Sequence, residues 1–307
     1  MPEWLIERGI GETRAILVDG GTIVEARVML AGQIAAGLIL KAKLKTVGRN
    51  AIALADGIEF LLPKGAPGVT QGAALTIEVA REAIGIEGWK RPLARVSDAP
   101  AAIFTFSGRP LAVTDNAFDD AGWPDLIEEA RSGIVGFRGG ALRVAVTPAM
   151  TLIDVDGSSP PGELAIAGAT ASAKAIRRHG IGGSIGIDLP TDGGKAARHA
   201  AAEAIDLALP QPFERTAVNG FGFVQIVRPR RHASLFELAL NRPAFEARAL
   251  LRSAARQMGK IELVAHPAVL AAMLPDWTDQ LARQIGGAVA LRSDPSLGIA
   301  GGHAVRR

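Results

Sequence analysis

The chain has 307 residues, of which 48% are hydrophobic, 21% are charged and none is cysteine. This content supports buried cores and argues against disorder, and the lack of cysteine excludes disulfides, thiolate zinc sites and cysteine nucleophiles. The formal charge of +3 is mild, so partners must be inferred from where charges cluster. No basic leader or bilayer-spanning run of roughly 20 apolar residues is seen, so we expect a cytoplasmic protein with no membrane partner.

The first part of the chain is typical of β structure. Segments 4–9, 13–21 and 22–30 read as strands, and 37–83 contains four or five short β-runs between turn residues, which indicates a small barrel. Three lysines alternate with apolar residues there, so a strand would place Lys41, Lys43 and Lys45 on one face. A basic face suits an anionic partner, and a plainly solvated face is the alternative.

After about Leu111 the pattern changes to strands alternating with helices, which is α/β order. Helices are predicted at 125–133, 162–180, 194–209 and 242–259, and strands within 141–157 and at 182–190 and 221–229. Segment 260–294 predicts a small strand-helix-helix-strand unit, and 298–307 is expected to be a mobile basic tail. Trp89 and Trp123 fall in loop-like stretches, where packing is favoured over base stacking.

Three aspartates stand at or near the ends of predicted strands. Asp154 and Asp156 close one strand, Asp188 closes another, and a turn and a helix lie between them. Such a segment has the length of one βαβ unit, whose strands are usually parallel neighbours. We therefore expect the acids to meet at the carboxyl edge of a sheet, where open α/β sheets bind ligands.

Converging carboxylates repel each other unless a hard cation lies between them. Mg²⁺ is often held by one or two carboxylates, so Asp154 and Asp188 are its candidate ligands, with Mn²⁺ as a substitute. Asp156 would be a third ligand or a residue that orients the others. The alternative is that Asp154 and Asp156 form a turn or cap ahead of the next helix.

Three arginines follow the next predicted strand, at Arg228, Arg230 and Arg231. Phosphodiester cleavage needs metal-binding acids beside arginines, because the cation polarises a phosphoryl oxygen and guanidinium groups hold the flanking phosphates. A basic surface turn is the alternative for this cluster.

Four blocks of the sequence together resemble the ribonuclease E/G family. They are ETRAILVDGG (12–21), TLIDVDGSS (151–159), AIRRHGIGGSIGIDL (175–189) and NGFGFVQIVRPR (219–230). The blocks occur in family order and, with the C-terminal stretch IELVAHPAVLAAML (261–274), cover nearly the whole chain.

The resemblance implies a Mg²⁺-dependent endoribonuclease that hydrolyses single-stranded RNA and leaves 5′-phosphate ends, in RNA processing or decay. By matching position, Asp154 and Asp188 would be the metal-binding catalytic acids, and Asp156 stands where the family usually has asparagine. Phe60 matches an RNA-stacking aromatic. The expected RNA-binding residues are Lys41, Lys43, Lys45, Phe60, Arg177, Arg228, Arg230 and Arg231.

The implied fold is mixed α/β and α+β, with five segments. They are a ribonuclease H-like unit (1–33 and 93–150), an inserted OB-fold RNA-binding barrel (34–92), a DNase I-like catalytic unit (151–240) and a small C-terminal domain (241–307).

The chain also departs from the family. It has no room after the barrel for the segment that senses a 5′-monophosphate, so we expect cleavage without 5′-end sensing. Without cysteine there is no zinc link, which leaves a monomer or a dimer not held by zinc.

Four substitutions bear on RNA affinity and catalysis. Ala53 takes the place of a second stacking aromatic, Gly220 that of an arginine and Gln225 that of a glutamate. Asp156, Gly220 and the missing sensor segment favour an alternative, a catalytically degenerate RNA-binding protein of the same fold. A metal-dependent phosphatase for a small ligand is a weaker alternative, since it leaves the basic barrel unexplained.

Overall fold

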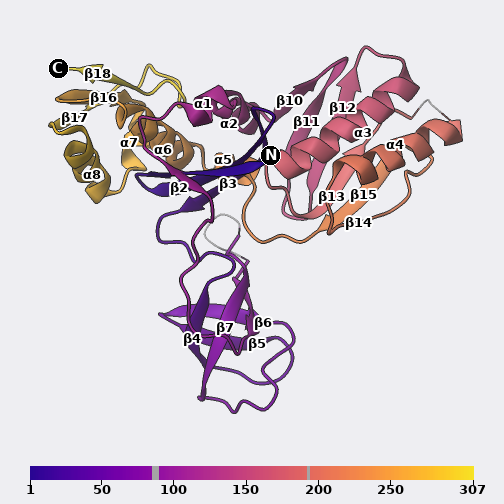
Figure 1. Ribbon diagram of the computed structural model, residues 1–307, viewed down its shortest axis with the longest axis horizontal. Coiled ribbons are helices and arrows are strands. Elements are labelled where there is room, and N and C mark those ends of the chain that lie inside the picture. Colours follow the sequence, from indigo (N-terminus) through magenta and orange to yellow (C-terminus); the bar gives the residue numbers. More distant parts are fainter. Residues whose placement is uncertain (85–89, 192–193) are drawn as a thin grey trace. The chain divides into compact units, whose positions relative to one another are not determined.

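The computed structural model describes all residues except 85–89 and 192–193, and the chain forms two compact units of mixed α+β structure (Figure 1). Unit 1 consists of Met1–Ala31, Ser107–Arg131 and Glu237–Arg307. Unit 2 consists of Gly32–Phe106 and Ser132–Phe236. None of the helices in the described part of the chain is long and apolar enough to cross a membrane.

Unit 1 contains a four-stranded sheet in the order β3-β2-β1-β9. Its strands are β1 (Glu3–Gly9), β2 (Glu12–Asp19), β3 (Thr22–Leu30) and β9 (Arg109–Leu111). The predicted strands β1 to β3 are confirmed. Gly20 and Gly21 both have positive φ, which lets the chain reverse between β2 and β3. Helices α1 (Ala117–Asp120) and α2 (Trp123–Ser132) follow β9.

The C-terminal part of unit 1 combines helices with a three-stranded sheet in the order β17-β16-β18. Its elements are α5 (Leu235–Leu240, which begins in unit 2), α6 (Arg242–Ala254), β16 (Ile261–Ala265), α7 (Pro267–Ala271), α8 (Pro275–Ile285), β17 (Val289–Ser293) and β18 (His303–Arg306). The expectation of a mobile tail is wrong, because β18 pairs antiparallel with β16 and gives that buried central strand a neighbour on both edges.

Unit 2 begins with a closed five-stranded barrel in the order β4-β5-β6-β8-β7, consistent with an OB-fold-like element. Its strands are β4 (Ile39–Leu44), β5 (Ala51–Ala55), β6 (Ile58–Leu62), β7 (Ala74–Arg81) and β8 (Leu93–Val96). The barrel closes through the antiparallel pair β4–β7, and alternate residues of each strand fill its interior.

The rest of unit 2 is a six-stranded sheet in the order β10-β11-β12-β13-β15-β14. Its strands are β10 (Ile134–Phe137), β11 (Gly140–Val146), β12 (Thr151–Gly157), β13 (Gly183–Asp188), β14 (Glu214–Arg215) and β15 (Phe223–Arg228). Helices α3 (Pro161–Arg178) and α4 (Gly194–Ala208) lie side by side on one face (Figure 1). They bury Ile176 and Ile205 against Ile153, Ile185 and Ile187 of the strands.

Two sequence-based boundaries differ from these units. The boundary at residue 150 separates β10 and β11 from β12, yet β11 is hydrogen-bonded to both β10 and β12 within one sheet. The barrel boundary at residue 92 leaves out β8, which pairs with β7. At residue 92 a strand of four residues follows the boundary, and its periodicity is too brief to assign it to a sheet. At residue 150 the boundary falls in the turn between β11 and β12, and periodicity does not reveal that these two strands pair.

Candidate functional site

The three aspartates lie on the face of the six-stranded sheet opposite α3 and α4. In β12 the side chains alternate, so Ile153 and Val155 are buried under the helices while Asp154 and Asp156 are exposed. We call this exposed side the open face. By register it carries Arg143, Leu152, Asp154, Asp156, Gly186, Asp188, Phe223 and Gln225.

The register of two parallel strands brings Asp154 and Asp188 together. β12 and β13 pair in parallel, as the βαβ spacing predicts, and Asp154 is the direct partner of Asp188, the last residue of β13. Neighbouring strands lie roughly 4.8 Å apart. The two carboxylates therefore leave adjacent backbones on the same side of the sheet.

This proximity affects protonation. The pKa of Asp154 is raised above its ordinary value, mainly because partial burial disfavours the charged carboxylate, and then because the charges of Asp156 and Asp188 repel it. Arg143 and the Val155 backbone act in the opposite direction but do not cancel these effects. A bound cation would relieve the repulsion.

Asp156 is engaged elsewhere. Arg143 of β11 donates from Nε to Asp156 Oδ2 at 3.1 Å, and both side chains are exposed. No group of three or more His, Cys, Asp or Glu side chains able to hold a metal occurs within the described residues. In this geometry the Asp156 carboxylate turns toward Arg143, and its role as a third metal ligand or as a residue that orients the others stays a prediction.

The aromatic side chain of Phe223 flanks Asp188 on the other side, and Phe221 lies in the turn that leads to it. Phe223 is its partner in the antiparallel pair β13–β15, and the Phe223 ring lies over Gly186, where a Cβ would come within 2.5 Å of Phe223 Cζ. Phe221 is 81% exposed in the turn before β15. The turn is fixed by Asn219, whose Oδ1 accepts hydrogen bonds from the backbone N–H groups of Phe221 (2.9 Å) and Phe223 (3.1 Å).

The expectation that arginines flank the acids is wrong for Arg228, Arg230 and Arg231. Because β15 runs antiparallel to β13, Phe223 pairs with Asp188 while Arg228 pairs with Gly183 at the far end of the strand. That five-residue step corresponds to roughly 17 Å.

Local contacts confirm this placement. Arg228 Nη1 donates to the carbonyl oxygen of Ile181 at 3.3 Å, just before β13. Arg177 lies in the last turn of α3, which precedes the same end of β13. The RNA-binding role of these four arginines stays a prediction.

The barrel lysines have the predicted alternation. Lys41 and Lys43 are exposed on β4, and Ala42 and Leu44 are buried in the barrel. Lys41 Nζ donates to Thr76 Oγ1 at 3.0 Å. Lys45 follows β4 and forms a 2.5 Å ion pair with Glu59. The lysine face exists, and its affinity for RNA is untested.

The expectation that Phe60 stacks on RNA bases is wrong. Phe60 is fully buried in the barrel core and pairs across the strands with Ala53, which is also fully buried. Both positions point inward, so neither can stack on a base. The resemblance predicted base stacking at Phe60, but the alternation of side chains along β6 turns Phe60 into the barrel. Trp123 is also packed, at 4% exposure, and Trp89 lies outside the described residues.

Arg143 and Phe223 were missed as neighbours of the acids, and Phe221 was missed as an exposed aromatic in the turn before β15. Arg143 could have been found from the hairpin of β11 and β12, because counting back from the turn pairs it with Asp154. The two phenylalanines gave no such signal, since their position depends on the direction of β15.

Comparison with known proteins finds no family model that matches the chain and no curated protein that is similar to it. The argument for function therefore depends on the geometry of the open face.

Proposed function

We propose that this protein is a Mg²⁺-dependent endoribonuclease that hydrolyses single-stranded RNA, leaving 5′-phosphate ends, without sensing the 5′ end of its substrate. The observation that carries the proposal is the parallel register of β12 and β13, which pairs Asp154 with Asp188 on an exposed sheet face. The pKa of Asp154 is raised first by burial and then by the charges of Asp156 and Asp188, and a bound cation would relieve this repulsion.

The residues fit a divalent cation. Asp154 and Asp188 supply the carboxylate oxygens that Mg²⁺ and Mn²⁺ prefer, and neither forms an ion pair with lysine or arginine within the described part of the chain. A cation held there supplies the means to polarise a phosphoryl oxygen and to lower the pKa of water.

The chain's own residues have three further roles in this proposal. Arg143, one strand away from Asp154, would hold a phosphate of the RNA backbone through its planar guanidinium. Phe221 and Phe223 would stack bases beside Asp188, an interaction that tolerates any sequence. Asp154 and Asp188 would hold the cation from adjacent strands.

We also propose the finer architecture implied by the resemblance. The barrel would be an OB-fold RNA-binding insert, whose exposed Lys41, Lys43 and Lys45 attract the phosphate backbone. The six-stranded sheet with α3 and α4 would be the DNase I-like catalytic unit. The sheet of β1, β2, β3 and β9 would belong to the ribonuclease H-like unit, followed by a small C-terminal domain.

The decisive experiment is cleavage of a fluorescent single-stranded RNA by wild type and by Asp188→Asn. We expect cleavage in Mg²⁺ but not in EDTA, and a loss of roughly 100-fold or more in the variant, because several kcal/mol of charge stabilisation is removed. Glu163→Gln is the matched control, since it removes an equal charge from an exposed position at the start of α3. Undiminished cleavage by Asp188→Asn would refute the proposal.

A second candidate is an RNA-binding protein of the same fold that does not cleave. The pairing of Arg143 with Asp156 favours it, because this ion pair occupies two polar groups beside the acids. This candidate predicts RNA binding that weakens steeply with salt and no Mg²⁺-dependent product after hours of incubation. The same cleavage assay, run beside a filter-binding titration, separates the two candidates.

A further inference from the structure

Unit 1 contains a cavity of about 290 Å³ that is unrelated to the open face of unit 2. It lies between β2, the α1–α2 region and α6, and its charged lining includes Arg14, Arg252, Arg256, Glu12 and Asp119. Its volume is at the small end of the range for ligand-binding pockets. Trp123, Ile127 and Phe245 provide apolar walls.

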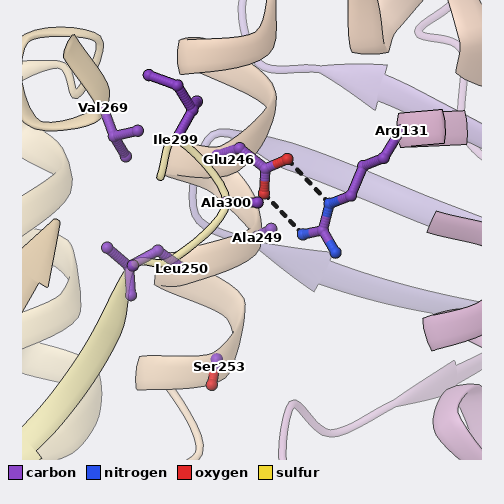
Figure 2. A pocket seen from close by; sticks show the side chains of 9 residues that line it. Arg131, Glu246, Ala249, Leu250, Ser253, Val269, Ile299 and Ala300 are labelled. Carbon is purple, nitrogen blue, oxygen red and sulfur yellow. Dashed lines mark hydrogen bonds and ion pairs between the residues drawn. The ribbon is translucent and has the colours of Figure 1, made fainter. Parts of the chain in front are cut away.

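A smaller neighbouring cavity of about 170 Å³ shows how one arginine of this region is already used. Figure 2 shows Arg131 facing Glu246, and the two form paired hydrogen bonds, Nε–Oε1 at 2.9 Å and Nη2–Oε2 at 2.6 Å. Such a fork satisfies both partners. Arg131 therefore contributes little to ligand binding, although it lines both cavities.

Two other arginines of the larger cavity have unused donors. Arg14 donates to Glu7 at 2.6 Å, but its buried Nε finds no acceptor within the described residues. Arg252 Nη2 forms an ion pair with Asp119 Oδ1 at 3.2 Å. The two atoms are not oriented for a hydrogen bond, so this buried nitrogen also has no acceptor within the described residues. Both side chains are almost fully removed from water, at 2% and 11% exposure.

Among the described residues, the ion pairs at the larger cavity contain one more positive than negative charge. They connect four arginines, Arg14, Arg248, Arg252 and Arg256, to three carboxylates, Glu7, Glu12 and Asp119. Arg131 and Arg242 form a separate cluster with Glu246 and Glu128, in which the charges balance.

Arg14 and Arg252 both line the cavity, and their positive charges act on each other. The pKa of Arg14 is lowered, first by burial, and the nearby charge of Arg252 acts in the same direction. Both guanidinium groups lie against the Trp123 ring, with Cζ atoms 5.9 and 5.5 Å from its centroid, which fixes their positions before any ligand arrives.

We propose that this cavity binds a small ligand through a phosphate group, held by Arg252 and Arg14 against the Trp123 wall. Arg256 adds its positive charge to the lining, while its own donors are bonded to Val113, Asp115 and Asp119. A phosphate monoester is an anion near neutral pH, so its charge is opposite in sign to the formal excess of one positive charge at the cavity. Guanidinium forks match the spacing of phosphate oxygens. The apolar side chains of Ile127 and Phe245 leave room for an organic group on the phosphate.

The test uses the full chain with inorganic phosphate and adenosine 5′-monophosphate as probes, at constant ionic strength set with chloride. We expect both probes to raise the melting temperature and to bind in calorimetry. A tighter Kd for the nucleotide would identify a phosphate ester as the ligand, and equal values would identify free phosphate. Equal thermal shifts in phosphate and in chloride would overturn the proposal.

Variants locate the binding in the cavity. Ala249→Glu adds a carboxylate to the lining from α6, where it competes for the same arginines, and should weaken phosphate binding by about tenfold or more. Ala244→Glu on the same helix adds the same charge at a half-buried position outside the lining and should leave the Kd within about twofold, because it does not compete for the arginines of the cavity.

A second variant protects the test against misfolding. Arg256→Gln should weaken phosphate binding while circular dichroism confirms folding, because Arg256 is only partly buried, at 25% exposure. Phosphate binding that is equal in Ala249→Glu and Ala244→Glu would overturn the assignment. RNA cleavage is a separate readout, so failure here is distinguishable from failure of the proposed nuclease function.

Discussion

The acidic side chains of the two units differ in their burial and in their partners. In unit 1, Glu7 and Glu246 are buried, and each is neutralised by arginines at 2.6 Å. In unit 2, Asp154 and Asp188 lie exposed on adjacent strands with each other as neighbours. Buried carboxylates that have arginine partners stabilise a fold or define a pocket, whereas an exposed carboxylate pair without such partners is available to a cation.

The largest contrast should appear when one arginine is removed from each unit. Arg14→Met leaves Glu7 and Glu12 with fewer partners in a buried site, so the free energy of unfolding should fall by about 3 to 5 kcal/mol. Arg143→Met removes the exposed partner of Asp156 and should cost less than about 1 kcal/mol. Urea denaturation followed by tryptophan fluorescence and circular dichroism measures both, and equal losses would contradict the comparison.

A smaller effect is expected where the open face is closely packed. Gly186→Ala places a Cβ within 2.5 Å of Phe223 Cζ and 3.0 Å of Leu152 Cδ2, so we expect a loss of about 1 to 3 kcal/mol from the free energy of unfolding. Gly220→Ala is the control, because no atom lies within 4 Å of its Cβ position. If both variants unfold at the same urea concentration, Phe223 does not lie over Gly186.

Magnesium should stabilise unit 2 through the acid pair. At a concentration ten times its Kd, Mg²⁺ should add about 1.4 kcal/mol to the free energy of unfolding of the wild type. Asp188→Asn should gain much less, because one of the two carboxylates is lost. The measurement is urea denaturation with Mg²⁺ or with EDTA, and an equal gain in both proteins would place the cation elsewhere.

The smallest effect concerns pH without divalent cations. The pKa of Asp154 is raised, so the folded state binds this proton more tightly than the unfolded state. The contribution of Asp154 to the free energy of unfolding should therefore decrease as pH rises from the ordinary value of 3.8 through the raised pKa.

Replacing the titrating group should remove this dependence. Asp154→Asn should be more stable than wild type at pH 7, by less than about 1 kcal/mol because the site is exposed, and the advantage should vanish near pH 3. A constant difference across this pH range would assign the effect to packing rather than to charge.

Long, strongly periodic segments made much of the fold predictable. The helix at 162–180 and the strands on either side of it were found from spacing alone, and the βαβ rule then gave the pairing of Asp154 with Asp188. The closed barrel followed from short β-runs and turn residues.

The positions of the arginines could not be obtained in this way. The chain leaves α4, forms the two-residue strand β14 and reverses before β15, so β15 runs antiparallel to β13. A strand of two residues has no detectable period, and without it the direction of β15 is undetermined. The prediction of base stacking by Phe60 was wrong for a related reason. Side chains alternate between the two sides of the barrel wall, so an error of one residue in the register moves a side chain from the outside to the inside.

The division of the chain has a consequence for the order of events during synthesis. The barrel strands β4 to β8 are contiguous, so this element can close as soon as it leaves the ribosome. Unit 1 instead joins three separate stretches, the last of which ends at Arg307. The arginine-lined cavity therefore cannot form until translation has passed α6. Until then, the charged side chains of the early strands of unit 1 stay solvated.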